Sequence, residues 1–132
     1  MNRRGWIVAA LAFGLLRPRV AMAVEERKKG GGASYIQLDP LTATIMRPDG
    51  RRGVITLECG VDVPDAALHA RAVQSTPLLH AAFAEVLRSY AAGLGPGAPP
   101  NADYLSMALQ RQTDTTLGRP GAKLLLGAII VN

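Results

Sequence analysis

Apolar and polar residues alternate most regularly between positions 54 and 63. Every second side chain in this stretch is apolar, namely Ile55, Leu57, Cys59, Val61 and Val63. The positions between them hold Thr56, Glu58, Gly60 and Asp62. A period of two over this length predicts an antiparallel strand that buries one face. Because Cys59 falls on the buried face, we expect a small core residue there and not a nucleophile.

Two further extended segments precede this strand. Residues 35–39 and 41–46 are rich in apolar and β-branched side chains. Pro40 separates them and lacks a backbone donor, so we expect an edge or a bend at that point. Residues 47–51 are predicted to form a turn, because Pro48 fixes its own φ and Gly50 tolerates a positive φ.

Helical spacing begins after Pro64. Residues 65–74 predict a short helix, with Ala66, Ala67, Ala70 and Val73 available for packing. Thr76 and Pro77 predict the start of a second helix, with Thr76 as the N-cap and Pro77 at the first helical position. The second helix has a core stripe at helical spacing, made of Leu79, Phe83, Val86, Leu87 and Tyr90.

Residues 93–100 are rich in glycine and proline and predict a loop. Asn101 is the expected N-cap of a third helix, and the glycine and proline of residues 118–121 are expected to end it. On or near the buried face of that helix we place Tyr104, Leu105, Ala108, Leu109 and Leu117.

The last segment, residues 124–131, is continuously apolar, which is typical of a strand covered on both faces. We therefore place it in the middle of the sheet, beside the strand that carries Ile55 and Leu57. The order of strand, turn, strand, three helices and strand predicts an α+β fold. In that fold the three helices pack on one face of a small antiparallel or mixed sheet.

Residues 1–23 have the layout of an export signal. Arg3 and Arg4 precede an apolar run that is about half the roughly 20 residues needed to span a bilayer. Ala21 and Ala23 form a small-x-small cleavage site. The arginine pair favours the twin-arginine route to the periplasm over the general secretory route. Cleavage after Ala23 is the favoured outcome, and retention of the segment as a membrane anchor is the alternative.

Composition narrows the classes of function. The formal charge of the whole chain is +5. Four of the 15 Lys and Arg residues lie in the signal segment, so the chain that follows residue 23 is nearly neutral. This balance argues against nucleic-acid binding, which requires a basic stripe on the folded domain. Residues 24–34 are charged and then glycine-rich, which predicts a flexible linker. The 48% hydrophobic content supplies a core for one domain, at residues 35–132.

The chain shows no catalytic or cofactor motif. Its single cysteine excludes an internal disulfide and a multi-cysteine metal site. His69 and His80 are separated by Pro77, so no helix face presents both to a metal. Asp62 and Asp65 form the closest pair of carboxylates, and a helix start explains them. We expect no catalytic residue, cofactor, metal or small-molecule substrate.

Several segments resemble the FliL family, the flagellar basal-body-associated proteins. Residues 35–41 (YIQLDPL) resemble the opening of that family's periplasmic domain, and residues 51–58 (RRGVITLE) resemble its second strand. Residues 77–83 (PLLHAAF) are similar to a helix start in the family. The apolar residues 124–131, followed by one polar amide, are similar to the family's C-terminal strand. Together the segments span residues 35–132.

The resemblance implies a stomatin-like fold, self-association into rings or partial rings, and contact with the flagellar stator, without catalytic residues. The expected function is a non-enzymatic periplasmic interaction domain with a protein partner. The alternative is an exported protein of another role, either a soluble partner of a larger complex or a hydrolase-type enzyme. We expect the interaction edge at Tyr35, Ile36 and Leu41, because an open strand there could pair with a neighbouring copy.

Overall fold

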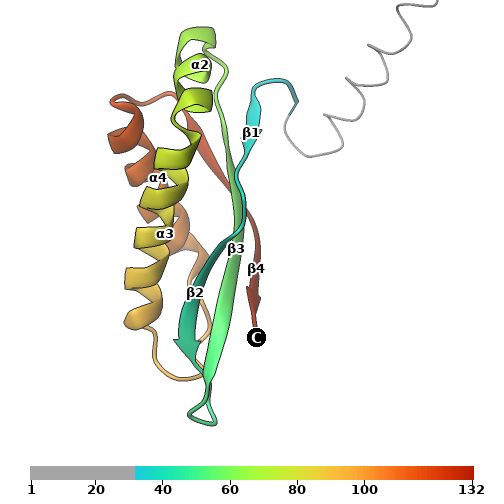
Figure 1. The fold of residues 1–132 in the computed structure, drawn as a ribbon, viewed down its shortest axis with the longest axis vertical. Coiled ribbons are helices and arrows are strands. Elements are labelled where there is room, and N and C mark those ends of the chain that lie inside the picture. The colour runs from blue at the N-terminus through green and yellow to red at the C-terminus, as the bar shows by residue number, and fades with distance from the viewer. Residues whose placement is uncertain (1–31) are drawn as a thin grey trace, which may run out of the picture. The chain divides into compact units, whose positions relative to one another are not determined.

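Strand β3, Arg52–Asp62, is the central strand of the sheet (Figure 1). The structure is a computed structural model that describes residues 32–132. Strands β1, Tyr35–Gln37, and β2, Leu41–Met46, pair antiparallel with one edge of β3. Strand β4, Lys123–Val131, pairs antiparallel with the other edge. The predicted export signal, with Arg3, Arg4, Ala21 and Ala23, lies outside the described residues, as does the predicted linker up to residue 31.

The folded unit begins one residue earlier than predicted. Ser34, which composition assigned to the linker, clusters with the domain. Its carbonyl oxygen accepts a hydrogen bond from the Val63 amide at 2.9 Å, and its hydroxyl donates to the Asp62 carboxylate. Ser34 therefore continues the pairing of β1 with β3 toward the N-terminus.

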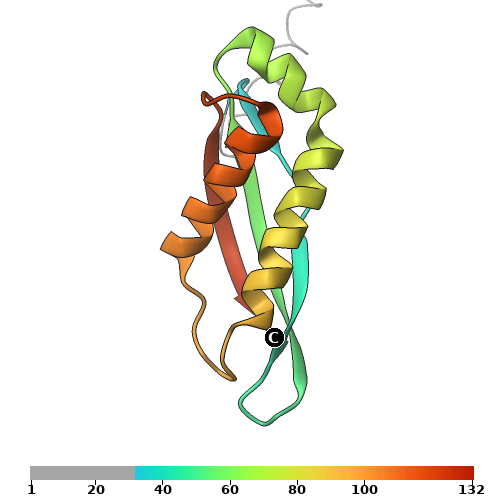
Figure 2. The same cartoon turned by 90° about the vertical axis from the view of Figure 1, so that its left-hand side faces the viewer.

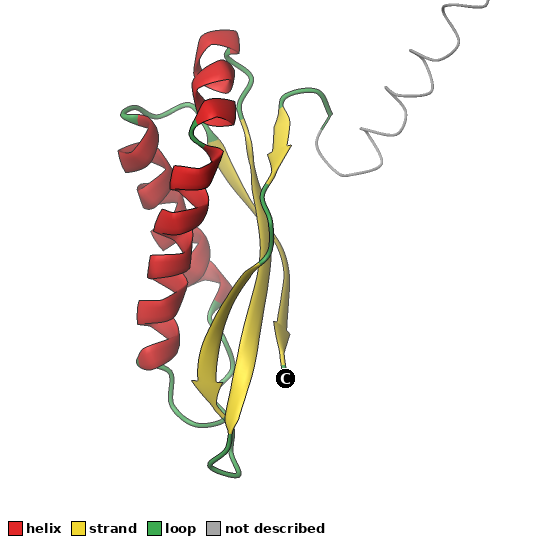
Figure 3. Ribbon diagram, viewed as in Figure 1, coloured by secondary structure: helices red, strands yellow, loops and turns green. Residues whose placement is uncertain are grey.

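Three helices cover one face of the sheet (Figures 2 and 3). They are α2, Ala66–Gln74, α3, Thr76–Ala92, and α4, Ala102–Leu117. Helix α3 packs on β2, helix α4 packs on β4, and the shorter α2 contacts both of the other helices. The predicted fold class, α+β with three helices on a small antiparallel sheet, is confirmed. Among residues 32–132, no helix combines the length and apolar character that a membrane crossing requires.

The core lies between this sheet and the helices. All five apolar residues predicted on one face of β3 are buried, and so are Leu79, Phe83, Leu87, Leu105, Leu109 and Leu117 from α3 and α4. Val86 and Tyr90 are half-buried against the core, and Tyr104 is exposed. Three residues of the predicted stripe of α3, Leu79, Phe83 and Leu87, are therefore confirmed as core residues. The other two, Val86 and Tyr90, lie at the rim of the core.

Capping explains where the helices begin and end. Asp65 accepts a hydrogen bond from the Leu68 amide at 2.9 Å, and Asn101 accepts one from the Tyr104 amide at 3.0 Å. Helix α4 ends at Gly118, whose φ of 86° suits glycine. The prediction that Thr76 is an N-cap is wrong. Ser75 holds that position, and the Thr76 hydroxyl instead donates to carbonyls at the end of α2.

The buried face of α2 also differs from the prediction. Leu68 and Ala72 are buried, whereas Ala66, Ala67, Ala70 and Val73 are exposed. Leu68 and Ala72 lie four residues apart and therefore share one face of the helix, which is the face turned to the core. Of the two, Leu68 buries the larger apolar surface.

Strand β4 lies beside β3 as predicted, but it is not in the middle of the sheet. It pairs with β3 alone, so within the described residues it is an edge strand. Helix α4 covers one of its faces, and Gly127, Ala128, Ile130 and Val131 are exposed. The continuous apolar run therefore does not reflect coverage on both faces.

Candidate interaction surface

The outer side of β4 has no strand partner within the described part of the sheet. The register with β3 runs from the pair of Asp62 and Lys123 to the pair of Ile55 and Val131. It shifts between Leu57 and Cys59, so residues 127 and 128 together face Glu58 across the ladder. This is a β-bulge with its extra residue in β4.

Hydrogen bonds at both ends of the ladder show which backbone groups of β4 point outward. Asn132 exchanges hydrogen bonds with Val54, at 2.9 and 3.0 Å, and therefore faces β3. In an antiparallel ladder the orientation alternates, so Val131 and Ile129 direct their N–H and C=O groups away from β3. At the other end the Cys59 carbonyl accepts from the Leu38 amide, so the backbone groups of Cys59 face the β1 side and not β4. Leu126 is the residue opposite Cys59 in the ladder, and its backbone groups therefore also point away from β3.

Gln110 of α4 occupies the first part of this outer side. Its side-chain oxygen accepts a hydrogen bond from the Leu124 amide at 2.8 Å, and its side-chain nitrogen donates to the Ala122 carbonyl at 2.8 Å. A neighbouring strand would make the same two kinds of hydrogen bond. The outward groups of residues 126–131 receive no such partner from residues 32–132. We call the outward-facing backbone of residues 126–131 the open edge.

The side chains along the open edge are apolar. Ile130 is 44% exposed and Val131 is also exposed, whereas Leu126 and Ile129 are half-buried against the core. No charged residue occurs between Leu124 and Asn132. Natural edge strands usually carry a charge, a proline or a bulge that discourages pairing. The open edge has no charge and no proline, and its bulge is confined to residues 127 and 128. Residues 129–131 therefore keep the regular geometry of a strand that can pair with another chain.

The opposite edge of the sheet is interrupted at two points, the bend at Pro40 and the end of β2, where the Met46 carbonyl accepts a hydrogen bond from the Gly97 amide at 3.4 Å. It is formed by the short β1 and by β2, with a bend at Pro40 between them. The Gln37 side chain donates to the Leu38 and Cys59 carbonyls, at 3.2 Å each, and so occupies backbone acceptors at this bend. The His80 ring lies 3.4 Å from the Pro40 carbonyl oxygen.

The three residues predicted as an interaction edge lie on this side of the sheet. Leu41 is buried in the core, and Ile36 packs against the core from a half-buried position. Tyr35 lies on the other face of the sheet, against Gly60. Their use as an interface stays a prediction, but of the three only Tyr35 has a side chain outside the core.

Cys59 is confirmed as a core residue. It is 1% exposed, and burial raises the pKa of its thiol to about 11. A thiol with so high a pKa carries little thiolate at neutral pH, and the thiolate is the nucleophilic form.

His69 lies on α2 and His80 lies on α3. Within residues 32–132 no group of three His, Cys, Asp or Glu side chains could hold a metal ion. The His69 Nε2 atom is buried and has no hydrogen-bond partner in this part of the chain. His80 lies near Pro40, on the side of α3 toward the β1–β2 bend.

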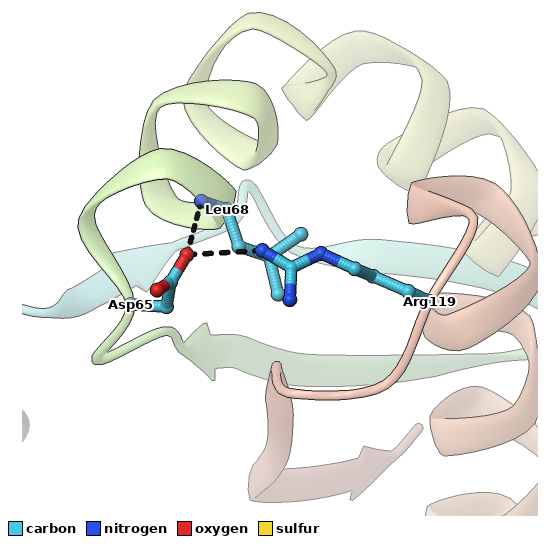
Figure 4. A network of polar contacts seen from close by, with 3 residues as sticks. All are labelled: Asp65, Leu68 and Arg119. Carbon is cyan, nitrogen blue, oxygen red and sulfur yellow. Dashed lines mark hydrogen bonds and ion pairs between the residues drawn. The ribbon is translucent and has the colours of Figure 1, made fainter.

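Asp65 has a structural role at the start of α2 (Figure 4). The same carboxylate oxygen accepts from the Leu68 amide and from the Arg119 guanidinium, the latter at 3.0 Å. The Leu68 amide, and after it the Arg119 guanidinium, hold the pKa of this carboxyl below its ordinary value. The ion pair connects the start of α2 to the turn between α4 and β4. The sequence-based explanation of Asp65 as a helix start is thus confirmed.

Two further surface features lie near the helices. An apolar groove lies between loop 93–100 and the end of β4, and its lining includes Met46, Leu94, Pro99 and Val131. The apolar surface of the open edge therefore continues into this groove. Between α3 and α4, the rings of Tyr90 and Tyr104 stack with centroids 5.6 Å apart. The Tyr90 hydroxyl accepts a hydrogen bond from the Asn101 amide at 2.7 Å, which fixes that ring in place.

Sequence reasoning missed the open edge because hydrophobicity reports whether faces are covered, not whether backbone groups are paired. One signal was present in the sequence. Gly127 and Ala128 interrupt the large apolar residues of β4, and a glycine inside a strand often marks a bulge. No model of a known protein family matches the chain, and no curated protein matches it either.

Proposed function

We propose that this chain is an exported, non-enzymatic interaction domain similar to the FliL proteins, and that it binds a protein partner through the open edge of β4. The partner we propose is a component of the flagellar basal body or its stator. The observation that carries the proposal is the uncharged, apolar strand edge at residues 126–131, whose outward backbone groups have no partner within the described residues.

Strand addition supplies the binding mechanism. A partner strand laid along the open edge would satisfy the outward groups of Leu126, Ile129 and Val131. Backbone hydrogen bonds would provide affinity, and the exposed Ile130 and Val131 side chains would provide apolar contacts. With little net charge on the domain, such contacts act at short range and not through long-range steering.

The location of the domain is the second part of the proposal. The segment with Arg3, Arg4, Ala21 and Ala23 directs the chain to the periplasm by the twin-arginine route and is removed after Ala23. The FliL-like segments and the order of elements support a stomatin-like arrangement and a flagellar role.

A matched pair of variants tests this function. Ile130 and Val54 both expose an apolar β-branched side chain, 44% and 42% respectively, on the sheet face away from the helices. Ile130 lies on the open edge, whereas Val54 lies on the central strand. Ile130→Lys places a charge where a partner strand would pair, and Val54→Lys adds the same charge one strand further from the edge.

The measurement is made in the organism that encodes the chain. We expect Ile130→Lys to reduce swimming and co-purification with tagged stator units, and Val54→Lys to preserve both. A deletion strain that swims and assembles stators like wild type would overturn the flagellar role. Equal binding by the two variants would overturn the edge as the site.

A further inference from the structure

We infer that the open edge of β4 pairs with the same edge of a second copy of this chain, antiparallel and about a two-fold axis. The inference rests on the proposed function in one respect, that this edge is the binding surface. It names a second occupant of the edge, which excludes the flagellar partner while the pair is formed. The result is one continuous sheet across two copies. The helices of both copies then lie on the same side of that sheet, because opposite residues of an antiparallel pair point to the same face.

The outward groups of the open edge suit a self-complementary contact. In a two-fold pairing the residues of one copy that donate are the residues that accept from the other. Leu126, Ile129 and Val131 present both N–H and C=O groups outward, as the register with β3 requires. Each copy thus supplies the donors and acceptors that the other lacks.

The charge distribution selects the antiparallel direction. Lys123 is the only charged residue of β4, and it lies at the end of the strand that Gln110 covers. Antiparallel pairing places the two Lys123 ammonium groups beyond opposite ends of the paired segment, and so farther apart than the roughly 20 Å that six residues of strand span. At physiological ionic strength this separation exceeds the screening length of about 8 Å. Parallel pairing would instead set the two like charges side by side.

Helix α4 adds a second contact on the covered face. Met107 is 60% exposed, and it lines a shallow depression with Lys123 and Leu124 at the start of β4. In the antiparallel pair, the start of one β4 lies beside the end of the other. Met107 of one copy therefore approaches Ile129 and Val131 of the second copy, which face the helix side across from Leu57 and Ile55. Apolar side chains left uncovered in one copy then cover those of the other.

A closed pair of this kind differs from the ring that the FliL resemblance implies. A ring requires two different surfaces on each copy, whereas the open edge uses one surface twice. Mass measurements therefore separate the two assemblies.

Sedimentation equilibrium of the purified full chain, from about 1 µM to about 1 mM, tests the pairing. We expect a reversible change from monomer to dimer, with a dissociation constant that rises roughly tenfold or more in Ile130→Lys and stays unchanged in Val54→Lys. Because a substitution in the sheet can alter the fold, a pair of helix variants provides an independent check. Met107→Glu should weaken the dimer, whereas Leu78→Glu, at an equally exposed leucine of α3, should not. A monomer at every concentration, or equal effects of Met107→Glu and Leu78→Glu, would overturn the inference.

Cysteine cross-linking tests the two-fold geometry. In a Cys59→Ala background, single cysteines are placed by Ala128→Cys, Ile129→Cys, Ile130→Cys and Val131→Cys. Identical positions meet only near a two-fold axis, so disulfide yield should peak at one position and fall on either side of it. A uniform yield would contradict the antiparallel pairing. If the chain dimerises but its deletion changes neither swimming nor stator assembly, the proposed function is rejected and the pairing stands. If a strictly monomeric chain binds the stator, the pairing is rejected and the proposed function stands.

Discussion

The side-chain amide of Gln110 lies against the backbone of Leu124, where its oxygen accepts the Leu124 N–H at 2.8 Å. Together with the bond from its nitrogen to the Ala122 carbonyl, this contact ends the accessible edge of β4 before residue 126. One side chain of α4 therefore both anchors the helix to the sheet and sets the length of strand that a partner can reach.

Removing this amide should destabilise the domain and lengthen the accessible edge. Gln110→Ala leaves the Leu124 amide and the Ala122 carbonyl without their partner, which costs about 1–3 kcal/mol in the free energy of unfolding. Hydrogen exchange of the Leu124 amide should become faster. Gln112→Ala is the matched control, because Gln112 lies on the same helix and bonds only Thr116. Equal exchange rates at Leu124 in the two variants would contradict this assignment.

Gly60 should tolerate no side chain. A Cβ at this position would lie 2.6 Å from the Ile36 carbonyl oxygen and closer still to the Tyr35 hydroxyl. Gly60→Ala should therefore destabilise by about 1–3 kcal/mol through overpacking, measured by chemical denaturation.

Two comparisons isolate the cause of that loss. Adding Tyr35→Ala should recover part of the stability, because the hydroxyl is removed while the Ile36 carbonyl remains. Gly95→Ala, whose Cβ would have its nearest neighbour at 4.0 Å, should change stability by less than about 0.5 kcal/mol. Additive effects of Tyr35→Ala and Gly60→Ala would show that the two residues are not in contact.

The alternating residues 54–63 predicted β3 correctly because one face of that strand is buried and the other is not. Because only one face is buried, apolar side chains must occupy every second position, and this fixes which side chains face the core. Strand β4 gave no such information. Its apolar run was consistent with a central strand, but chain order could not show that only β3 was available to pair with it. The open edge, and with it the candidate site, therefore required the structure.

Helix termini were predictable where a side chain makes the cap. Asp65 and Asn101 accept amide hydrogen bonds as expected. Thr76 failed because Ser75 already occupies the capping position, and two helices separated by a single residue leave no room for a second cap. Local sequence does not distinguish adjacent capping residues when the intervening turn is this short.

Cys59 should be dispensable for function and unreactive in the native protein. Cys59→Ala should cost roughly 1 kcal/mol through a small cavity, whereas Cys59→Asp should cost far more because it buries an unpaired charge. A thiol reagent should label the native protein only as fast as the protein opens. Rapid stoichiometric labelling would show that this side chain is accessible.

The raised pKa of Cys59 also predicts a dependence of stability on alkaline pH. The unfolded thiol ionises near 9.0 and the folded thiol at about 11. The folded state therefore retains its proton longer, and stability is full below pH 9 and falls as the pH rises toward 11. As the pH rises from about 9 to about 11, the wild type should therefore lose stability relative to Cys59→Ala, which has no thiol to ionise. Parallel pH profiles for the two proteins would contradict the assigned burial.

Asp65 predicts the opposite behaviour in acid. The Leu68 amide and the Arg119 guanidinium lower the pKa of this carboxyl in the folded state. Its contribution is present above the carboxyl's ordinary pKa and is lost as the pH falls through the lowered value. Asp65→Ala should therefore be less stable than wild type at pH 7, and the difference should shrink in strong acid. Asp65→Asn, which still caps the helix but loses the charge, should fall between them.

Export should depend on the arginine pair near the N-terminus. The twin-arginine translocon recognises both guanidinium groups, whereas a general secretory signal needs only positive charge. The double variant Arg3→Lys with Arg4→Lys should therefore leave the precursor in the cytoplasm, as followed by fractionation and immunoblotting. Sequencing the N-terminus of the periplasmic form should identify Val24 as its first residue, because Ala21 and Ala23 form the small-x-small motif that ends at the expected cleavage site. Normal periplasmic accumulation of the double variant would reject the twin-arginine route, and an uncleaved wild-type protein at the membrane would favour the retained anchor.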